Sequence, residues 1–290
     1  MSEVFVRTNE PPRLRPFQRL RELWRDREIL ANLARKELRV KYKSSTLGVA
    51  WSMLNPVLYL LVFYVVFTYF LPTRVDHFPV YLLSGLLPWT LFTTGLMGAT
   101  TAVIGGANLV PKVAFPHEML PLAAIRAQTV NFFFQWVVLV LFLLLFGYPL
   151  VHRGTLLLPL ALAVLLLFTT TLGFATSALN VRYRDTGHLV ELALVAWFWS
   201  TPIVYPASLV QENLKGAFSL YLLNPMANIV LAFQRGIYGG ISPGALDELP
   251  AVGLTWYGVR LLVVGAVSLI LLYFTWRLFF RRSGDFAEEL

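Results

Sequence analysis

Long apolar runs separated by short polar segments organise most of this chain. Each run is long enough, as a helix, to cross or nearly cross a bilayer core of about 30 Å. The first run has no charged side chain, and none of the runs shows the two-residue alternation of barrel strands. We therefore predict an all-α integral membrane protein with six transmembrane helices, at residues 48–71, 80–104, 125–148, 156–179, 188–205 and 255–280.

A further apolar stretch, residues 217–238, is ambiguous by composition. Asn224-Pro225 interrupts it, and proline removes a helical hydrogen-bond donor. Counting it as a span would place Arg277, Arg281 and Arg282 outside, against the bias of Lys and Arg toward the cytoplasmic side. We therefore predict short interfacial or re-entrant helices on the outer side, between the fifth and sixth spans.

Positive charge orients the predicted bundle. With six spans, 19 of the 24 Lys and Arg residues lie on inner segments and five lie outside, so both termini are expected in the cytoplasm. Residues 13–42 read as one or two amphipathic helices along the cytoplasmic leaflet, with Phe17, Leu20 and Trp24 on one face. The expected organisation is a cytoplasmic N-terminal segment (1–47), a six-span domain (48–280) and a cytoplasmic tail (281–290).

Composition narrows the class of protein further. Hydrophobic residues make up 57% of the 290 residues and charged residues only 14%, which excludes an ordinary soluble domain. The net charge of +8 collects at the ends of the spans, so topology explains it better than a nucleic-acid-binding face does. The chain has no cysteine, which excludes disulfides and thiolate metal sites.

Several sequence fragments resemble one family of membrane proteins. In their order along the chain they match the permease subunits of polysaccharide-exporting ABC transporters, the type-2 permeases of O-antigen, capsule, teichoic acid and galactan export. The similarity covers about residues 30–280. The fragments are RKELRVKYKSSTLGVAWSMLNPV (35–57), LLSGLLPW (82–89), ANLVPKVAFPHEMLPLA (107–123), LNVRYRDTGHLVE (179–191), STPIVYP (200–206) and NPMANIV (224–230).

The resemblance implies a half-transporter rather than an enzyme. Two copies of the chain would form the membrane part, and two copies of a separate ABC ATPase would bind ATP and Mg²⁺. The chain itself has no Gly-Lys dipeptide and hence no GxxxxGK[ST] phosphate-binding loop. The implied cargo is a lipid-linked polysaccharide, moved across the cytoplasmic membrane of a bacterium. Export of a drug, lipid or other small amphiphile is the alternative within the family.

Two groups of aromatic residues are candidates for the substrate pathway. Tyr59, Phe63, Phe67 and Phe70 follow one another at spacings of four, four and three in the first span, and Trp197, Phe198, Trp199 and Tyr205 crowd the outer half of the fifth. A glycan in a membrane needs flat apolar surfaces or polar groups, because each unpaired hydroxyl costs several kcal/mol to bury. We expect Tyr59, Phe63, Phe67, Phe70, Trp197, Trp199 and Tyr205 to contact sugar. Packing between helices is the alternative for each one.

Two inner segments are candidates for contact with the ATPase, with a solvated turn as the alternative for both. The first joins the second and third spans, and the second joins the fourth and fifth. The expected coupling residues are Pro111, Lys112, Phe115, Pro116, His117, Glu118, Arg182, Arg184 and Asp185.

Other polar residues near the spans allow weaker inferences. Gln128, Asn131 and Gln135 share one face of the third span, where hydrogen bonding between helices is favoured over pathway lining. Glu191 is expected to pair with Arg184 or to reach the membrane interface. Neither His117 nor His188 has the partners of a metal site. Two other classes of protein are alternatives to a transporter. A membrane-embedded transferase would need acids or histidines clustered at one membrane face. A scaffold protein would have no ATPase partner.

Overall fold

The computed structural model describes residues 16–43, 45, 48, 50–70, 75–109, 115–250 and 252–289. Within these ranges the chain is helical and contains no β-strand. The α-helices are α1 (Pro16–Arg25), α2 (Arg27–Tyr42), α3 (Ala50–Val65), α4 (Phe78–Gly105), α5 (Met119–Leu145), α6 (Leu157–Arg182), α7 (Thr186–Trp199), α8 (Ala207–Leu214), α9 (Phe218–Tyr221), α10 (Pro225–Ile237), α11 (Leu254–Arg282) and α12 (Phe286–Glu289). One π-helical segment, Val66–Phe70, continues α3. Short 3-10 segments lie at Arg153–Leu156, Lys215–Ala217, Tyr238–Gly240 and Pro243–Leu246.

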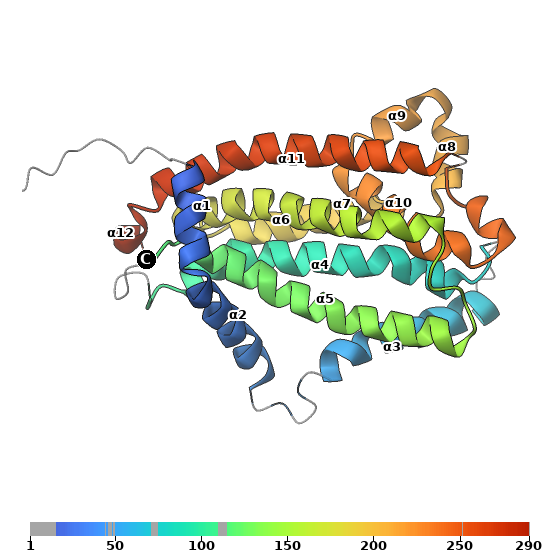
Figure 1. Ribbon diagram of the computed structural model, residues 1–290, viewed down its shortest axis with the longest axis horizontal. Helices are drawn as coiled ribbons and strands as arrows, with labels where there is room; N and C mark the ends of the chain where they lie inside the picture. Colours follow the sequence, from blue (N-terminus) through green and yellow to red (C-terminus); the bar gives the residue numbers. More distant parts are fainter. Residues whose placement is uncertain are drawn as a thin grey trace, which may run out of the picture.

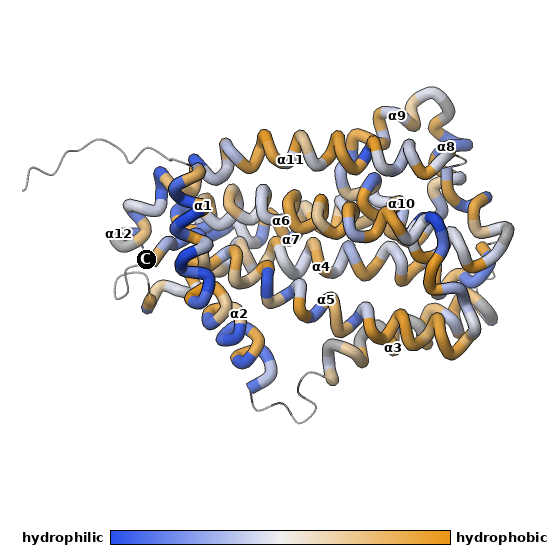
Figure 2. The backbone as a smooth tube through the Cα atoms, in the orientation of Figure 1, coloured by the Kyte–Doolittle hydropathy of each residue, from blue (hydrophilic) through white to orange (hydrophobic). Residues whose placement is uncertain are grey.

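The long helices run side by side and give the molecule two distinct ends (Figure 1). Helix α1 crosses one end, where α12 and the C-terminus also lie, and we call this the proximal end. Helices α8, α9 and α10 gather near the other end, which we call the distal end. Hydrophilic residues are concentrated on α1 and α2, whereas hydrophobic residues follow the long helices (Figure 2).

In the part of the chain that the structure describes, four helical segments are long and apolar enough to cross a membrane. They are α4, α5, α11 and the combined segment Arg153–Arg182, which contains α6. Helix α3 and its π-helical continuation together have 21 residues, about 30 Å of helix. Helix α7 has only 14 residues, or about 21 Å, which is shorter than a bilayer core.

The fifth predicted span is wrong at its C-terminal end. Residues 188–205 were expected to form one helix, but α7 ends at Trp199 and residues 200–206 form turns. Pro202 and Pro206 lack backbone donors, so a helix through this segment would lose hydrogen bonds. At the other expected spans the helices lie within a few residues of the predicted ranges, except that α5 starts six residues early, at Met119.

The ambiguous stretch 217–238 folds into two helices, as predicted, but the second is buried inside the bundle. Eleven of the thirteen residues of α10 are buried, and α10 packs against α4, α6 and α11. The interruption that Asn224-Pro225 makes in this stretch is the N-terminus of α10. The Asn224 side chain accepts hydrogen bonds from the backbone N–H groups of Met226 and Ala227, and Pro225 occupies the first helical position.

Side chains of α4, of α10 and of the residue before α10 bond to the backbone carbonyls of the turn at residues 200–206. Asn224 donates to the carbonyl of Ser200 at 3.0 Å, and Gln234 donates to that of Pro202 at 2.8 Å. The hydroxyl of Tyr81, a fully buried residue of α4, donates to the carbonyl of Tyr205 at 2.8 Å. Such internal pairing is required in a membrane protein, because hydrocarbon offers no alternative partner.

Small and polar residues allow α4 and α6 to approach closely. The hydroxyls of Thr100 and Thr176 lie 2.7 Å apart, and Asn180 donates to the carbonyl of Thr100 at 3.0 Å. At Gly173 of α6, an added Cβ would lie 2.9 Å from the Cβ of Ala99 on α4. Glycine at this position therefore sets the separation of the two helices.

We predict that Gly173→Ala destabilises the protein by about 1–3 kcal/mol, because the new methyl group overpacks the contact with Ala99. The measurement is the midpoint of thermal unfolding in detergent. Gly258→Ala on α11 is the control, since a Cβ there meets no atom within 4 Å and should leave the midpoint unchanged or slightly raised. Equal midpoints for the two variants would contradict the prediction.

Candidate functional site

A groove of about 590 Å³ lies between α3, α4 and α7, and we call it the pathway groove. Its lining combines flat aromatic rings, threonine hydroxyls and one carboxylate among aliphatic side chains. These residues are Tyr59, Phe63, Trp89, Phe198, Thr90, Thr93, Thr94 and Glu191. The groove therefore offers both apolar flat surfaces and hydrogen-bonding atoms along the length of membrane-embedded helices.

The expected aromatic stripe on α3 forms a continuous ladder of rings. Tyr59 stacks on Phe63 with ring centroids 6.2 Å apart, and Phe63 stacks on Phe67 at 5.9 Å. Phe67 ends the ladder against Phe78 of α4, at 4.0 Å. Tyr59 and Phe63 line the pathway groove, whereas Phe70 lies at the end of the π-helical segment and is 73% exposed.

The expected aromatic residues of the fifth span point in different directions. The Trp197 indole N–H donates to Asn224 at 2.8 Å, and its ring packs edge-on against Phe92, so Trp197 is half-buried against the core. Trp199 is 62% exposed, and the Tyr205 hydroxyl donates to the Trp199 carbonyl. The residue of this cluster that lines the pathway groove is Phe198.

Sequence reasoning missed the wall of the groove formed by α4. Thr90, Thr93 and Thr94 recur at helical spacing in an otherwise apolar span, and that spacing was the available signal. Each hydroxyl donates to a carbonyl of its own helix, at 2.6–3.2 Å, which leaves lone pairs on the hydroxyl oxygens as acceptors. Trp89 precedes this run and adds a ring to the same wall.

A small polar pocket of about 130 Å³ adjoins the groove and shares Thr90 and Thr94 with it. The polar face of α5 lies here, because Gln128, Asn131 and Gln135 all line the pocket. The hydroxyl of Tyr42 from α2 donates to Asn131 at 2.7 Å, as expected of hydrogen bonding between helices. Glu191 lines the neighbouring groove and forms no ion pair with Arg184.

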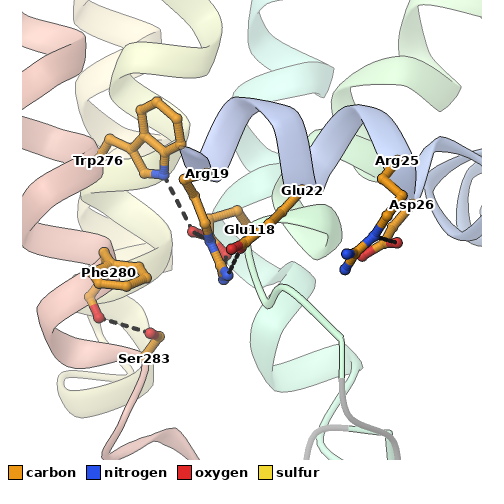
Figure 3. Close-up of polar contacts among 8 residues, drawn as sticks. All are labelled: Arg19, Glu22, Arg25, Asp26, Glu118, Trp276, Phe280 and Ser283. Atoms are coloured by element: carbon orange, nitrogen blue, oxygen red, sulfur yellow. Dashed lines mark hydrogen bonds and ion pairs between the residues drawn. The ribbon is translucent and has the colours of Figure 1, made fainter. Parts of the chain in front are cut away.

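Glu118 is the centre of a second site, at the proximal end (Figure 3). Its carboxylate is fully buried and accepts two hydrogen bonds from the Arg19 guanidinium, both 2.8 Å long. The indole N–H of Trp276 donates to the same carboxylate at 3.3 Å, and the guanidinium lies 5.2 Å from the centre of the Phe280 ring. We call Arg19, Glu118, Trp276 and Phe280 the inner cluster. It joins α1, the segment before α5, and α11.

The inner cluster is held mainly by electrostatics in a largely buried site. The pKa of Arg19 is raised: burial disfavours the guanidinium charge, but the hydrogen bonds and charges of Glu118 and Glu22 outweigh that cost. A bidentate pair with a carboxylate is also the most directional contact available to arginine. The sequence distance of 99 residues between the partners explains why local pattern reading did not find the pair.

The other expected coupling residues that the structure describes also lie at the proximal end. Pro116 is buried, and Phe115 packs edge-on against His117 with ring centroids 5.7 Å apart. Burial lowers the pKa of His117. Arg182, Arg184 and Asp185 are exposed at the turn between α6 and α7. Pro111 and Lys112 lie outside the described residues.

We predict that Glu118→Gln lowers the free energy of unfolding by about 1.5–3 kcal/mol, because it removes the charge-assisted contact of the buried carboxylate and leaves Arg19 only the more exposed Glu22 as an anionic partner. Thermal unfolding in detergent measures the effect. The matched control is Glu22→Gln, which removes the other carboxylate on Arg19, at 2.6 Å, but from a side chain that is 42% exposed.

The control should cost about 0–1 kcal/mol, as is usual for exposed pairs. Exchanging the partners, as Arg19→Glu with Glu118→Arg, should recover part of the lost stability. Equal losses for Glu118→Gln and Glu22→Gln would contradict the assignment of the buried pair as the main contact.

Comparison with known proteins identifies the family of this chain. The chain is 33% identical to the O-antigen export system permease protein RfbA of Myxococcus xanthus, over 93% of this chain and 98% of that protein. It is 28% identical to a protein of the same name from Klebsiella pneumoniae, over 71% and 79% of the two chains. The polysialic acid transport protein KpsM of Escherichia coli is 23% identical, over 81% and 89%. Residues 29–238 match the family of ABC-2 type transporters, and the chain is a member of that family.

Proposed function

We propose that this chain is the permease subunit of an ATP-driven exporter that moves a lipid-linked polysaccharide across the bacterial cytoplasmic membrane. The observation that carries the proposal is the near full-length similarity to an O-antigen export permease. Two copies of the chain form the membrane part, and two copies of a separate ABC ATPase supply the energy. ATP and Mg²⁺ bind to that ATPase, and the permease itself catalyses no reaction.

The pathway groove has the chemistry that a glycan needs. A single hexose carries several hydroxyls, and moving them unpaired into hydrocarbon costs on the order of ten kcal/mol or more. The rings of Tyr59, Phe63 and Phe198 offer flat surfaces to the C–H faces of sugars, and the oxygens of Thr90 and Thr94 offer acceptors to their hydroxyls. A second copy would face this groove and close the pathway.

We assign six spans to this topology: α3 with its π-helical continuation, α4, α5, α6, α7 and α11. The proximal end, with α1 and α12, is cytoplasmic, so both termini of the chain are on the cytoplasmic side. This orientation is supported by the basic residues of α1 and α2 and by Arg281 and Arg282 at the end of α11. Helix α7 is short for a span, and the turns and buried helix α10 that follow it fill the distal part of the bundle.

The inner cluster supports a route for coupling. The ATPase contacts the segment before α5 and the turn at residues 182–185, which both lie at the proximal end. Because Glu118 is bonded to α1 and α11 as well, a movement of that segment is passed to both helices.

We predict that combined replacement of Tyr59, Phe63 and Phe198 by leucine lowers export at least about tenfold, because three sugar-stacking surfaces are lost. Glycan at the cell surface and lipid-linked glycan inside the cell are the two measurements. The control is Phe274→Leu, an aromatic residue of α11 that is 58% exposed and outside the groove.

The triple variant should still purify with the ATPase. Normal glycan export by it would refute the assigned pathway. Accumulation of a small amphiphile, with unchanged glycan export in cells depleted of the protein, would instead support the alternative cargo.

We also predict that single cysteines at Phe115 and Arg184 crosslink to the ATPase through a bismaleimide reagent, because both lie at the proximal end. The chain has no cysteine of its own, so each label is unique. A cysteine at Leu246, which is 39% exposed at the distal end, is the control and should give no crosslink. Crosslinking at Leu246 alone would reverse the proposed orientation.

A further inference from the structure

A second large pocket lies on the other side of α3, between α3, the start of α4 and the end of α5. Its volume is about 680 Å³, within the range of small-molecule sites. Side chains such as Val57, Leu61, Val138 and Leu141 make its lining almost wholly apolar. Leu61 is 59% exposed and Leu141 is 52% exposed, so the pocket opens to the surroundings of the bundle. In a membrane, those surroundings are lipid.

Three side chains of the lining carry polar atoms, Tyr64, His77 and Tyr148, and the last two lie together at one end of the pocket. His77 precedes α4 and Tyr148 follows α5, so both lie at the distal end of the bundle. The Tyr148 hydroxyl and His77 Nδ1 are 2.8 Å apart, and both residues line the pocket. Val138 lies seven residues before Leu145, the last residue of α5, or about 10 Å along the helical rise, and Tyr148 follows that end of the helix. The pocket therefore changes from polar to apolar along the direction of the bundle, as an amphiphilic lipid does.

His77 is held in an unusual backbone conformation. Its φ is 51°, and among the described residues it is the only non-glycine with a positive φ. A left-handed conformation costs a residue with a Cβ about 1–2 kcal/mol. His77 occupies the N-cap position of α4, yet its side chain makes no capping hydrogen bond and is bonded to Tyr148 instead. The fold thus accepts strain that places an imidazole at the rim, and such strain is concentrated at functional sites.

The paired rim residues keep one hydrogen-bond donor for a ligand. Neutral histidine has one N–H and tyrosine has one O–H, and the contact between them uses only one of these. Whichever tautomer is present, a donor remains. A phosphate oxygen is a strong acceptor for it.

We propose that this pocket is a lipid site that takes one acyl chain of a glycerophospholipid, with the phosphodiester bound at His77 and Tyr148. Helix α3 separates this lipid from the pathway groove. Val57 and Leu61 face the lipid pocket, whereas Tyr59 and Phe63, two residues further along the helix in each case, face the groove. The proposal of a lipid site rests only on contacts within a single chain. That the lipid belongs to the outer leaflet follows from the proposed orientation, in which the distal end is on the outer side.

The test uses the full chain, without ATPase or glycan, in vesicles that contain a phosphatidylglycerol with a photoactivatable group on one acyl chain. Labelled peptides are identified by mass spectrometry. We expect labelling on residues 57–64 and 138–145. Leu141→Trp should reduce it about tenfold by filling the pocket. Leu144→Trp is the matched control, because Leu144 is 55% exposed on the same helix but does not line the pocket.

The head-group contact has its own test. His77→Gly with Tyr148→Phe should reduce labelling by phosphatidylglycerol about threefold to tenfold, since glycine adopts the left-handed conformation readily and neither new residue has a side-chain donor for the phosphate. Labelling by a matching diacylglycerol, which has no phosphate, should not change. Unfolding temperatures measured in parallel identify a variant that is misfolded. In that case, a change in the NMR chemical shifts of Tyr148 when lipid is added tests the contact in the unaltered chain.

Three results would overturn the proposal. They are equal labelling of the two tryptophan variants, labelling of α11 as strong as that of α3 and α5, and disulfide-linked dimers through a cysteine at Leu141, which would make a second copy the occupant. None of these results depends on export. Failure of the lipid site would therefore leave the proposed transport function standing, and failure of export would leave the lipid site standing.

Discussion

The requirement that every backbone polar group find a partner inside the protein governs the distal half of this fold. The chain leaves α7 at Trp199, turns through two prolines, and later starts a buried helix in the middle of the bundle. Neither feature is tolerated in hydrocarbon unless side chains replace the missing helical bonds. The side chain of Asn224 supplies two of these replacement bonds: it caps the N-terminus of α10 and donates to the carbonyl of Ser200. It also accepts a hydrogen bond from the indole N–H of Trp197. The packing of α10 among α4, α6 and α11 then excludes lipid from the turn.

The proximal half is organised by charge instead. One buried carboxylate, Glu118, ties together three segments that are far apart in sequence. A buried ion pair is weak evidence for net stability, because desolvation offsets most of the attraction, but it is strong evidence for a defined geometry. Here the geometry connects the helix that precedes the first span, the segment that leads into α5 and the last long helix. Any protein docked at this end of the bundle meets these three segments as one unit.

Helix α3 has few neighbours and separates two environments. Its contacts with α4 and α5 are much less extensive than those of α6 with α11. One of its faces carries the aromatic ladder and the other lines an apolar pocket with a polar rim. In the proposed arrangement the sugar of the cargo passes one face of this helix, and a separate membrane phospholipid occupies the pocket on the other face. A helix held loosely on both sides is also the element that can move with least disruption of the core.

The sequence by itself determined the helical class, the ranges of most long helices, the break at Asn224-Pro225 and the aromatic spacing on α3. These features follow from local chemistry: apolar length, the missing donor of proline and the helical repeat. Only the tertiary structure decided that Phe198 rather than Trp197 faces the groove, that α10 is buried, and that Glu118 pairs with Arg19. The reason is that a nearly uniformly apolar helix has no pattern to fix its rotation. Its facing side is chosen by contacts with residues up to a hundred or more positions away.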